Sequence, residues 1–317
     1  MKKIVLILFI LCSTGEIFAQ SFYSRRINRK WVASGGIGYA RALGDLTNPG
    51  SYFDSKLNIE GGIHYRLNER FNLRTNILFF QMSGDDSKID PELNTRVRDL
   101  SFVSNNVELS STVSVSLFPM PRRFTERKLV NPYIFAGIGG LFFSPRGTVP
   151  DSVFIPGMGV RSVPQGGETV SLAQYDTERP NDYNRFAFVI PVGLGVRVKV
   201  TEFLDISAEV SNRITFTDYL DDVSGRSYPE PESFDFSNPE DITAYALANP
   251  NNADPDGVRG NPENDDYYMI VNIKADFYIQ GDLLNRVFGI GGKRFNIKPR
   301  RRGGIFGRRS NVKRRLP

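Results

Sequence analysis

The feature that most constrains the fold is a period of two in hydrophobicity that recurs along the chain. Residues 56–67 place apolar or small side chains at every odd position, and the even positions are polar or charged apart from Gly62. Successive side chains of a strand point to opposite faces, so this pattern predicts a strand with one apolar and one polar face. The pattern recurs in 71–79, 107–117, 186–200, 204–216 and 267–279.

Two glycine-rich segments, 31–43 and 133–143, bring the expected number of strands to eight, although neither shows a clear apolar face. Each strand has about 10 residues or more, the length that a tilted membrane strand requires. The connections alternate between tight turns, at 68–70 and 201–203, and long polar stretches, at 44–55, 84–100, 147–184 and 217–266. The intermediate connection 119–130 is the exception.

Short periplasmic turns and long external loops are typical of outer-membrane barrels. The sequence therefore predicts an all-β fold, an eight-stranded antiparallel transmembrane β-barrel with long extracellular loops. A soluble sandwich or a lipocalin-like barrel is the alternative, in which the apolar faces would pack inward and the strands would be shorter. An eight-stranded barrel is just wide enough for side chains to fill it, so we expect a plugged interior and no wide pore.

The polar faces of the expected strands carry many ionisable residues. In a barrel these side chains face the lumen, where we expect them to neutralise one another. The predicted lumen charge network consists of Glu60, Arg66, Arg74, Glu108, Arg197, Lys199, Asp205, Glu209, Arg213, Lys274 and Asp276.

The N-terminus predicts export. Two lysines follow Met1, residues 4–11 are apolar, and a small residue, Ala19, precedes Gln20, which describes a cleaved secretory signal. The apolar run is too short for a membrane helix. Cys12 lies inside this segment behind large residues, which disfavours lipidation and leaves the expected mature chain without cysteine. We expect a signal peptide at 1–19, an outer-membrane barrel at 20–281 and a basic periplasmic tail at 282–317.

The tail concentrates positive charge. The formal net charge is +5, yet residues 293–315 contain eleven Lys and Arg residues and no carboxylate. An exported protein rarely meets nucleic acid, so we expect no nucleic-acid partner. The hypothesis is that the tail binds an acidic periplasmic protein, and a disordered solubilising tail is the alternative. The candidate partner-binding residues are Arg300, Arg301, Arg302, Arg308, Arg309, Lys313, Arg314 and Arg315.

Catalytic chemistry has few candidates. His64 is the only histidine and is expected to face the lumen near a periplasmic turn, far from the external rim where a hydrolase would need it. The run 216–224 has three aspartates, but it lacks the pattern of a calcium loop, so turn capping is favoured and Tyr219 is expected in the interfacial aromatic girdle. The glycines of 137–140 open no helix and indicate barrel curvature or close packing. We expect no enzyme activity, cofactor or metal.

Five stretches in order carry a family resemblance: NVELSSTVSVSLFP (106–119), PYIFAGIGGLFFSPRG (132–147), FAFVIPVGLGVRVKV (186–200), FTDYLDDVSGRSY (216–228) and RGNP with the acidic and aromatic residues after it (259–268). The chain resembles the PorG-like outer-membrane barrels of the Bacteroidetes, which are linked to the type IX secretion system. The resemblance implies a non-enzymatic anchor or scaffold in protein secretion, set among outer-membrane lipid, with a periplasmic secretion ring as the partner of the tail. A small channel, or an adhesin whose external loops bind ligands, is the alternative.

Overall fold

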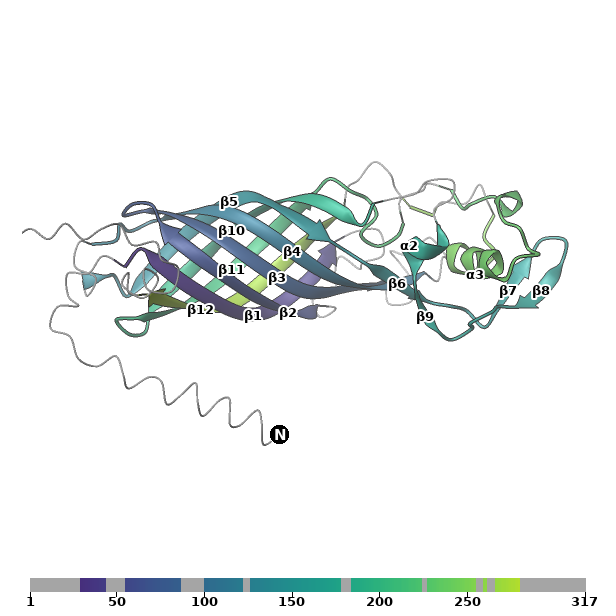
Figure 1. The fold of residues 1–317 in the computed structure, drawn as a ribbon, viewed down its shortest axis with the longest axis horizontal. Coiled ribbons are helices and arrows are strands. Elements are labelled where there is room, and N and C mark those ends of the chain that lie inside the picture. The colour runs from purple at the N-terminus through teal and green to yellow at the C-terminus, as the bar shows by residue number, and fades with distance from the viewer. Residues whose placement is uncertain are drawn as a thin grey trace, which may run out of the picture. The chain divides into compact units, whose positions relative to one another are not determined.

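The computed structural model describes residues 29–43, 55–86, 100–121, 126–177, 184–223, 227–254, 259–260 and 266–279. Eight strands pair in antiparallel order around a ring, and the last pairs with the first to close it (Figure 1). The predicted eight-stranded antiparallel barrel is therefore confirmed. Its strands are β1 (Trp31–Leu43), β2 (Lys56–Arg66), β3 (Phe71–Asp85), β4 (Ser101–Ser116), β5 (Val130–Phe142), β10 (Phe186–Lys199), β11 (Leu204–Thr215) and β12 (Tyr267–Ile279).

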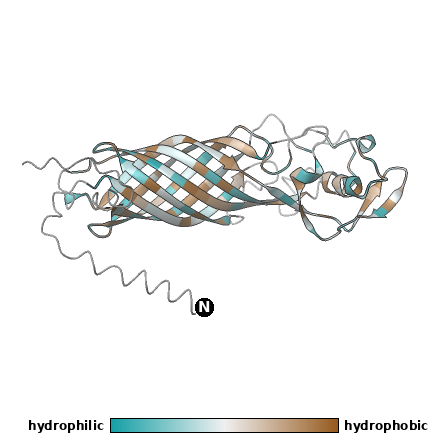
Figure 2. Cartoon of the chain, in the orientation of Figure 1, coloured by the Kyte–Doolittle hydropathy of each residue, from teal (hydrophilic) through white to brown (hydrophobic). Residues whose placement is uncertain are grey.

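The outer wall of the barrel is apolar. Large side chains such as Leu57, Ile37 and Ile273 remain 68%, 65% and 62% exposed, whereas inward residues beside them such as Asn58 and Lys274 are buried. Figure 2 shows the same alternation of hydropathy along the strands. A closed barrel with an apolar exterior satisfies its backbone groups internally, as a membrane span requires. The protein is thus an outer-membrane β-barrel, and the soluble alternative is wrong.

Two tight turns join strands at one end of the barrel. The amides of Arg70 and Phe71 each donate to Asn68 Oδ1 at 2.8 Å. At the second turn, the amides of Phe203 and Leu204 each donate to Thr201 Oγ1 at 3.1 Å. These side-chain acceptors stabilise the tight turns that the sequence predicts. Because short turns are typical of the periplasmic end of an outer-membrane barrel, we assign this end to the periplasm.

Glycines make room inside the barrel for long neighbouring side chains. Gly195 is the register partner of Tyr133, and a Cβ at this glycine would lie 2.6 Å from the Tyr133 ring. Gly36 pairs with Lys274 in the same way, and a Cβ there would lie 2.6 Å from Lys274 Cγ. The glycine-rich strands therefore accommodate side chains that cross the lumen.

The long connections at 147–184 and 217–266 contain regular structure, which the sequence analysis did not predict. Strand β6 pairs with β4 and with β9, so the sheet continues past the barrel rim. We call the described residues of 145–177 and 227–260 the external cap. No helix among the described residues is long and apolar enough to cross a membrane. The cap elements are β6 (Pro145–Thr148), β7 (Ser152–Ile155), β8 (Gly159–Ser162), β9 (Thr169–Ser171), α2 (Leu172–Tyr175), η5 (Pro231–Ser233) and α3 (Pro239–Ala248).

Candidate functional site

The centre of the lumen holds a cluster of ionised side chains. Arg74 Nη2 donates to both carboxylate oxygens of Glu209, at 2.7 and 2.9 Å, and Tyr133 donates its hydroxyl to Glu209 at 2.5 Å. Lys274 Nζ lies 3.6 Å from the same carboxylate and also pairs with Glu60. These residues come from β2, β3, β5, β11 and β12, so the cluster ties opposite walls of the barrel together.

The periplasmic mouth is closed by a second cluster. Arg127 Nη1 donates to both oxygens of Asp205, at 2.9 and 2.7 Å, and its guanidinium lies over the Tyr278 ring, 4.4 Å from the centroid. Tyr278 in turn donates its hydroxyl to Asp205 at 2.6 Å. The sequence analysis did not foresee this role of Arg127, which lies in the connection 119–130. A basic residue in a loop gives no sign that it folds back into the lumen.

Two further ion pairs of the described residues belong to this network. Arg213 Nε donates to Glu108 Oε2 at 3.1 Å, beside the Tyr268 hydroxyl, which donates to the same oxygen at 2.9 Å. Nearer the periplasm, Arg197 Nε donates to Asp276 Oδ2 at 3.2 Å.

Arg66 and Lys199 occupy periplasmic ends of their strands, Arg66 buried and Lys199 half-buried. The structure thus places the predicted lumen residues on inward positions and shows ion pairs for Glu60, Arg74, Glu108, Arg197, Asp205, Glu209, Arg213, Lys274 and Asp276.

The extracellular half of the lumen contains buried apolar side chains beside polar ones such as Asn106 and Glu108, so the expectation of a polar interior is only partly met there. Leu78, Phe80 and Met82 of β3 point inward and are at most 5% exposed. They pack in one hydrophobic cluster with Leu141 and Ile270 from across the barrel. Both faces of residues 77–80 are apolar, so the period of two no longer distinguishes inside from outside in this part of β3.

The same cluster continues into the external cap without a break. It includes Val153 and Ile155 of β7, Leu172 of α2 and Tyr245 of α3, all at most 5% exposed. Ion pairs and hydrogen bonds therefore fill the periplasmic part of the lumen, and apolar side chains together with the Arg213–Glu108 pair fill the extracellular part.

We expect the purified protein to conduct no ions through planar lipid bilayers. Side chains fill an eight-stranded barrel, and here both halves of the lumen contain packed or ion-paired groups. Single-channel recording at 1 M KCl provides the measurement, with a porin incorporated at the same protein-to-lipid ratio as the positive control. Regular unitary current steps from the protein would contradict the expectation that the lumen is closed to ions.

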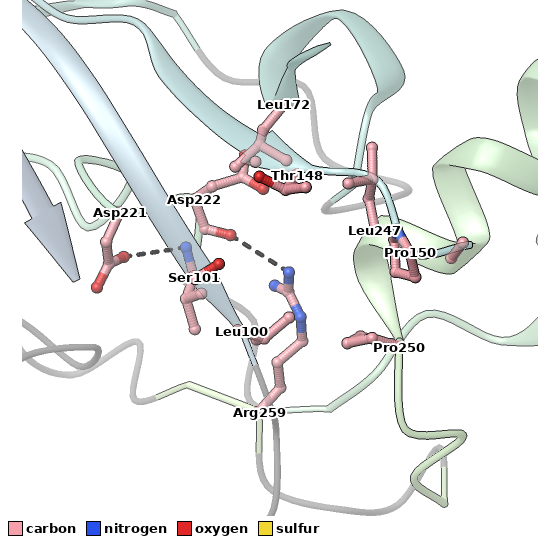
Figure 3. A pocket seen from close by; sticks show the side chains of 13 residues that line it. Leu100, Ser101, Thr148, Pro150, Leu172, Asp221, Asp222, Leu247, Pro250 and Arg259 are labelled. Atoms are coloured by element: carbon pink, nitrogen blue, oxygen red, sulfur yellow. Dashed lines mark hydrogen bonds between the residues drawn. The ribbon is translucent and has the colours of Figure 1, made fainter. Parts of the chain in front are cut away.

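A small cavity lies among β6, α2, α3 and the segment 218–223 (Figure 3). Arg259 crosses it, donating from Nε to the carbonyl of Ala248 and from Nη2 to the carbonyl of Asp222, both at 3.3 Å. The cavity measures about 40 Å³, which is room for one or two water molecules. Arg259 therefore connects, by hydrogen bonds, segments that are distant in sequence. The cavity itself is too small for an organic ligand.

The aspartates of 218–222 support the fold of the cap. Asp221 Oδ1 accepts from the amide of Val223 at 3.0 Å, and Asp222 accepts from the Thr177 hydroxyl. No group of three potential metal ligands occurs among the described residues. Tyr219 packs against the hydrophobic cluster, so its expected place in the lipid-facing girdle is wrong.

The other residues singled out in the sequence are His64, the glycines of 137–140 and the two chain termini. His64 is buried in the lumen, with Nε2 3.0 Å from Ser34 Oγ. The glycines of 137–140 lie in β5, where a Cβ at Gly137 would meet the backbone of β4 at 2.1 Å, and close strand packing explains that glycine. The expected signal peptide at 1–19 and the tail residues of 282–317, including the eight candidate partner-binding residues, lie outside the described residues.

Comparison with known proteins adds no closer identification. No family model matches the chain, and no curated protein is similar to it. Among solved structures it is similar to Neisserial surface protein A, at 10% identity over 78% of this chain and 97% of that chain, with a TM-score of 0.37. It is also similar to OprG from Pseudomonas aeruginosa, at 9% identity, 80% and 98% coverage and a TM-score of 0.38. It is also similar to Ail of Yersinia pestis, at 10% identity over 79% of this chain and 99% of that chain, with a TM-score of 0.36. The outer-membrane location rests on the closed strand ladder and the apolar exterior of this chain.

Proposed function

We propose that this outer-membrane barrel is a non-enzymatic anchor or scaffold subunit of a protein secretion system of the type IX kind. The observation that carries the proposal is the lumen filled by side chains, in which Arg74, Glu209 and Lys274 are buried and an apolar cluster lies on the extracellular side. A barrel that transports nothing through its interior works through its two ends. The resemblance of the five stretches between residues 106 and 268 to PorG-like barrels supports a role in secretion.

The periplasmic end is the proposed docking surface. With an even number of strands, both termini of such a barrel are expected on the periplasmic side, where the basic tail could meet a ring of the secretion machine. Arginine forms paired hydrogen bonds with carboxylates, so the expected partner presents an acidic face.

Deleting residues 295–317 is expected to abolish co-purification of periplasmic partners from cross-linked outer membranes, because all eight candidate partner-binding residues are lost. A full-length variant in which the same eight Arg and Lys residues are replaced by Gln separates charge from length, and it should lose the partner as well. Heat-modifiable migration on gels checks that the barrel still folds in both variants. Undiminished recovery of the same partners from the deletion variant would refute the docking role of the tail.

An adhesin is the second candidate, and one observation favours it. The hairpin of β7 and β8 presents Phe154, Met158 and Val160 to solvent, 44%, 51% and 70% exposed, on a folded cap outside the membrane. Exposed apolar side chains that gather in one place are typical of interaction sites. Loss of cell-surface binding after replacing these three residues with Ser, with secretion unaffected, would favour the adhesin over the scaffold.

A further inference from the structure

A shallow groove of about 600 Å³ crosses the outer wall of the barrel. Its base follows one row of register partners on five neighbouring strands, from β4 through β5, β10 and β11 to β12. The row consists of Val113, Ala136, Val192, Asn212 and Met269. These residues point outward, so the groove opens toward lipid and not toward the lumen.

The groove runs obliquely along the barrel wall, from the periplasmic side of β4 toward the extracellular side of β12. Val113 lies three residues from the periplasmic end of β4, and Met269 lies two residues from the extracellular end of β12. Four strand spacings correspond to a path of about 19 Å. Half of the hydrocarbon core is about 15 Å thick. A slanting path of this length spans about one leaflet, so the groove has the length of a single acyl chain.

Asn212 is the polar residue of this apolar groove. Its side chain is exposed on the lipid-facing wall and makes no hydrogen bond with any described residue. Two pairs of outward polar residues satisfy each other, Thr75 with Ser111 at 3.1 Å and Gln81 with Asn105 at 3.0 Å, and the outward Ser83 and Ser101 lie near the extracellular ends of β3 and β4. An unsatisfied amide in hydrocarbon costs several kcal/mol, so Asn212 requires a partner that the described chain does not provide.

The position of Asn212 indicates which part of a lipid meets it. Ile214, the next outward residue of β11, is the register partner of Tyr267, and Phe216 follows at the rim. Asn212 therefore lies one outward step, about 7 Å along the strand, below the row of Tyr267. Aromatic side chains mark the level of the lipid headgroups. The carboxamide consequently meets the first few carbons of an outer-leaflet acyl chain.

We propose that this groove binds an acyl chain of an outer-leaflet glycolipid of the lipid A type, and that Asn212 hydrogen-bonds to the polar group near the head of that chain. A carboxamide has two donors and an acceptor. A hydroxyl or a secondary amide on the chain satisfies both functions, whereas the ester carbonyl of a phospholipid only accepts. The tail of the chain then runs over Val192 and Ala136 toward the periplasmic end of β4.

The test uses the full-length protein in detergent and native mass spectrometry. Increasing amounts of lipid A, or of phosphatidylethanolamine as the plain-chain probe, are added, and the lipid-bound fraction is measured. Asn212→Leu keeps the size of the side chain and removes the hydrogen bond. We expect lipid A affinity to fall about fivefold in this variant, the equivalent of one hydrogen bond. Phosphatidylethanolamine binding should be weaker than lipid A binding and unchanged by the substitution.

Two variants separate the groove from the rest of the protein. Ala136→Phe fills the groove without altering Asn212 and should also weaken lipid A binding. Ile63→Phe, on the outward face of β2 across the barrel, makes a similar change outside the groove and should not. The basic tail is present in all variants, so any binding of lipid phosphates to it is common to all of them. Equal lipid A affinity of the wild type and both groove variants would overturn the proposal, as would an equal loss in Ile63→Phe.

Discussion

Replacing Glu209 with alanine is expected to lower the free energy of unfolding by about 3 kcal/mol or more. Glu209 is 7% exposed and accepts hydrogen bonds from Arg74 and Tyr133, with Lys274 3.6 Å away. Its removal leaves the Arg74 guanidinium buried without its carboxylate. Urea titration of the protein in lipid vesicles measures the effect, with Trp31, the single tryptophan of the chain, as the fluorescent reporter of folding.

Two controls show whether the loss comes from an uncompensated buried charge. Glu69→Ala removes a carboxylate from an exposed periplasmic turn and should change the unfolding free energy by less than about 0.5 kcal/mol. The double variant Arg74→Met with Glu209→Leu removes both charges, and we expect it to be more stable than Glu209→Ala alone because no buried arginine is left unpaired. If the single and double variants were equally destabilised, packing rather than charge would be responsible.

The barrel strands could be predicted because the alternation of apolar and polar side chains is visible within each short stretch of sequence. Each strand is long, and alternation along a strand such as β11 separates lipid-facing Val210 and Ile214 from inward Glu209 and Arg213 over consecutive residues. The identity of the inward charges follows from the same pattern. Which charges pair does not follow from it, because most of the partners lie on strands that are not neighbours. Arg74 of β3 and Glu209 of β11 are 135 residues apart and meet only when the ring closes.

The external cap could not be predicted from periodicity, but one of its elements has a local signature that the sequence analysis missed. The Asn238 side chain accepts from the amide of Glu240, Pro239 occupies the first turn of α3, and Glu240 and Asp241 follow as acidic residues. These are the start signals of a helix. The strands β6 to β9 have three or four residues each, too short for an alternating pattern to stand out. Their order comes from packing around the shared hydrophobic cluster.

Replacing Ala246 with aspartate is expected to unfold the cap while leaving the barrel closed. Ala246 of α3 is fully buried within the hydrophobic cluster, and an unpaired carboxylate there costs several kcal/mol. The barrel keeps its strand ladder because every barrel strand pairs with two neighbours. A loss of about 3 kcal/mol raises the population of the open cap about a hundredfold, since 1.4 kcal/mol corresponds to a factor of ten.

Trypsin treatment of intact cells measures this separation. The exposed Arg146 and Arg161 of the cap provide cleavage sites, and we expect them to be cut far faster in Ala246→Asp than in the wild type. Gln174→Asp introduces the same charge at an exposed position of α2 and should leave the cleavage rate unchanged. The barrel fragment of Ala246→Asp should keep its heat-modifiable migration, because the ion pairs around Arg74 and Glu209 lie in the centre of the lumen, away from the cap. Loss of that migration together with cap cleavage would mean that the hydrophobic cluster makes the cap and the barrel a single cooperative unit.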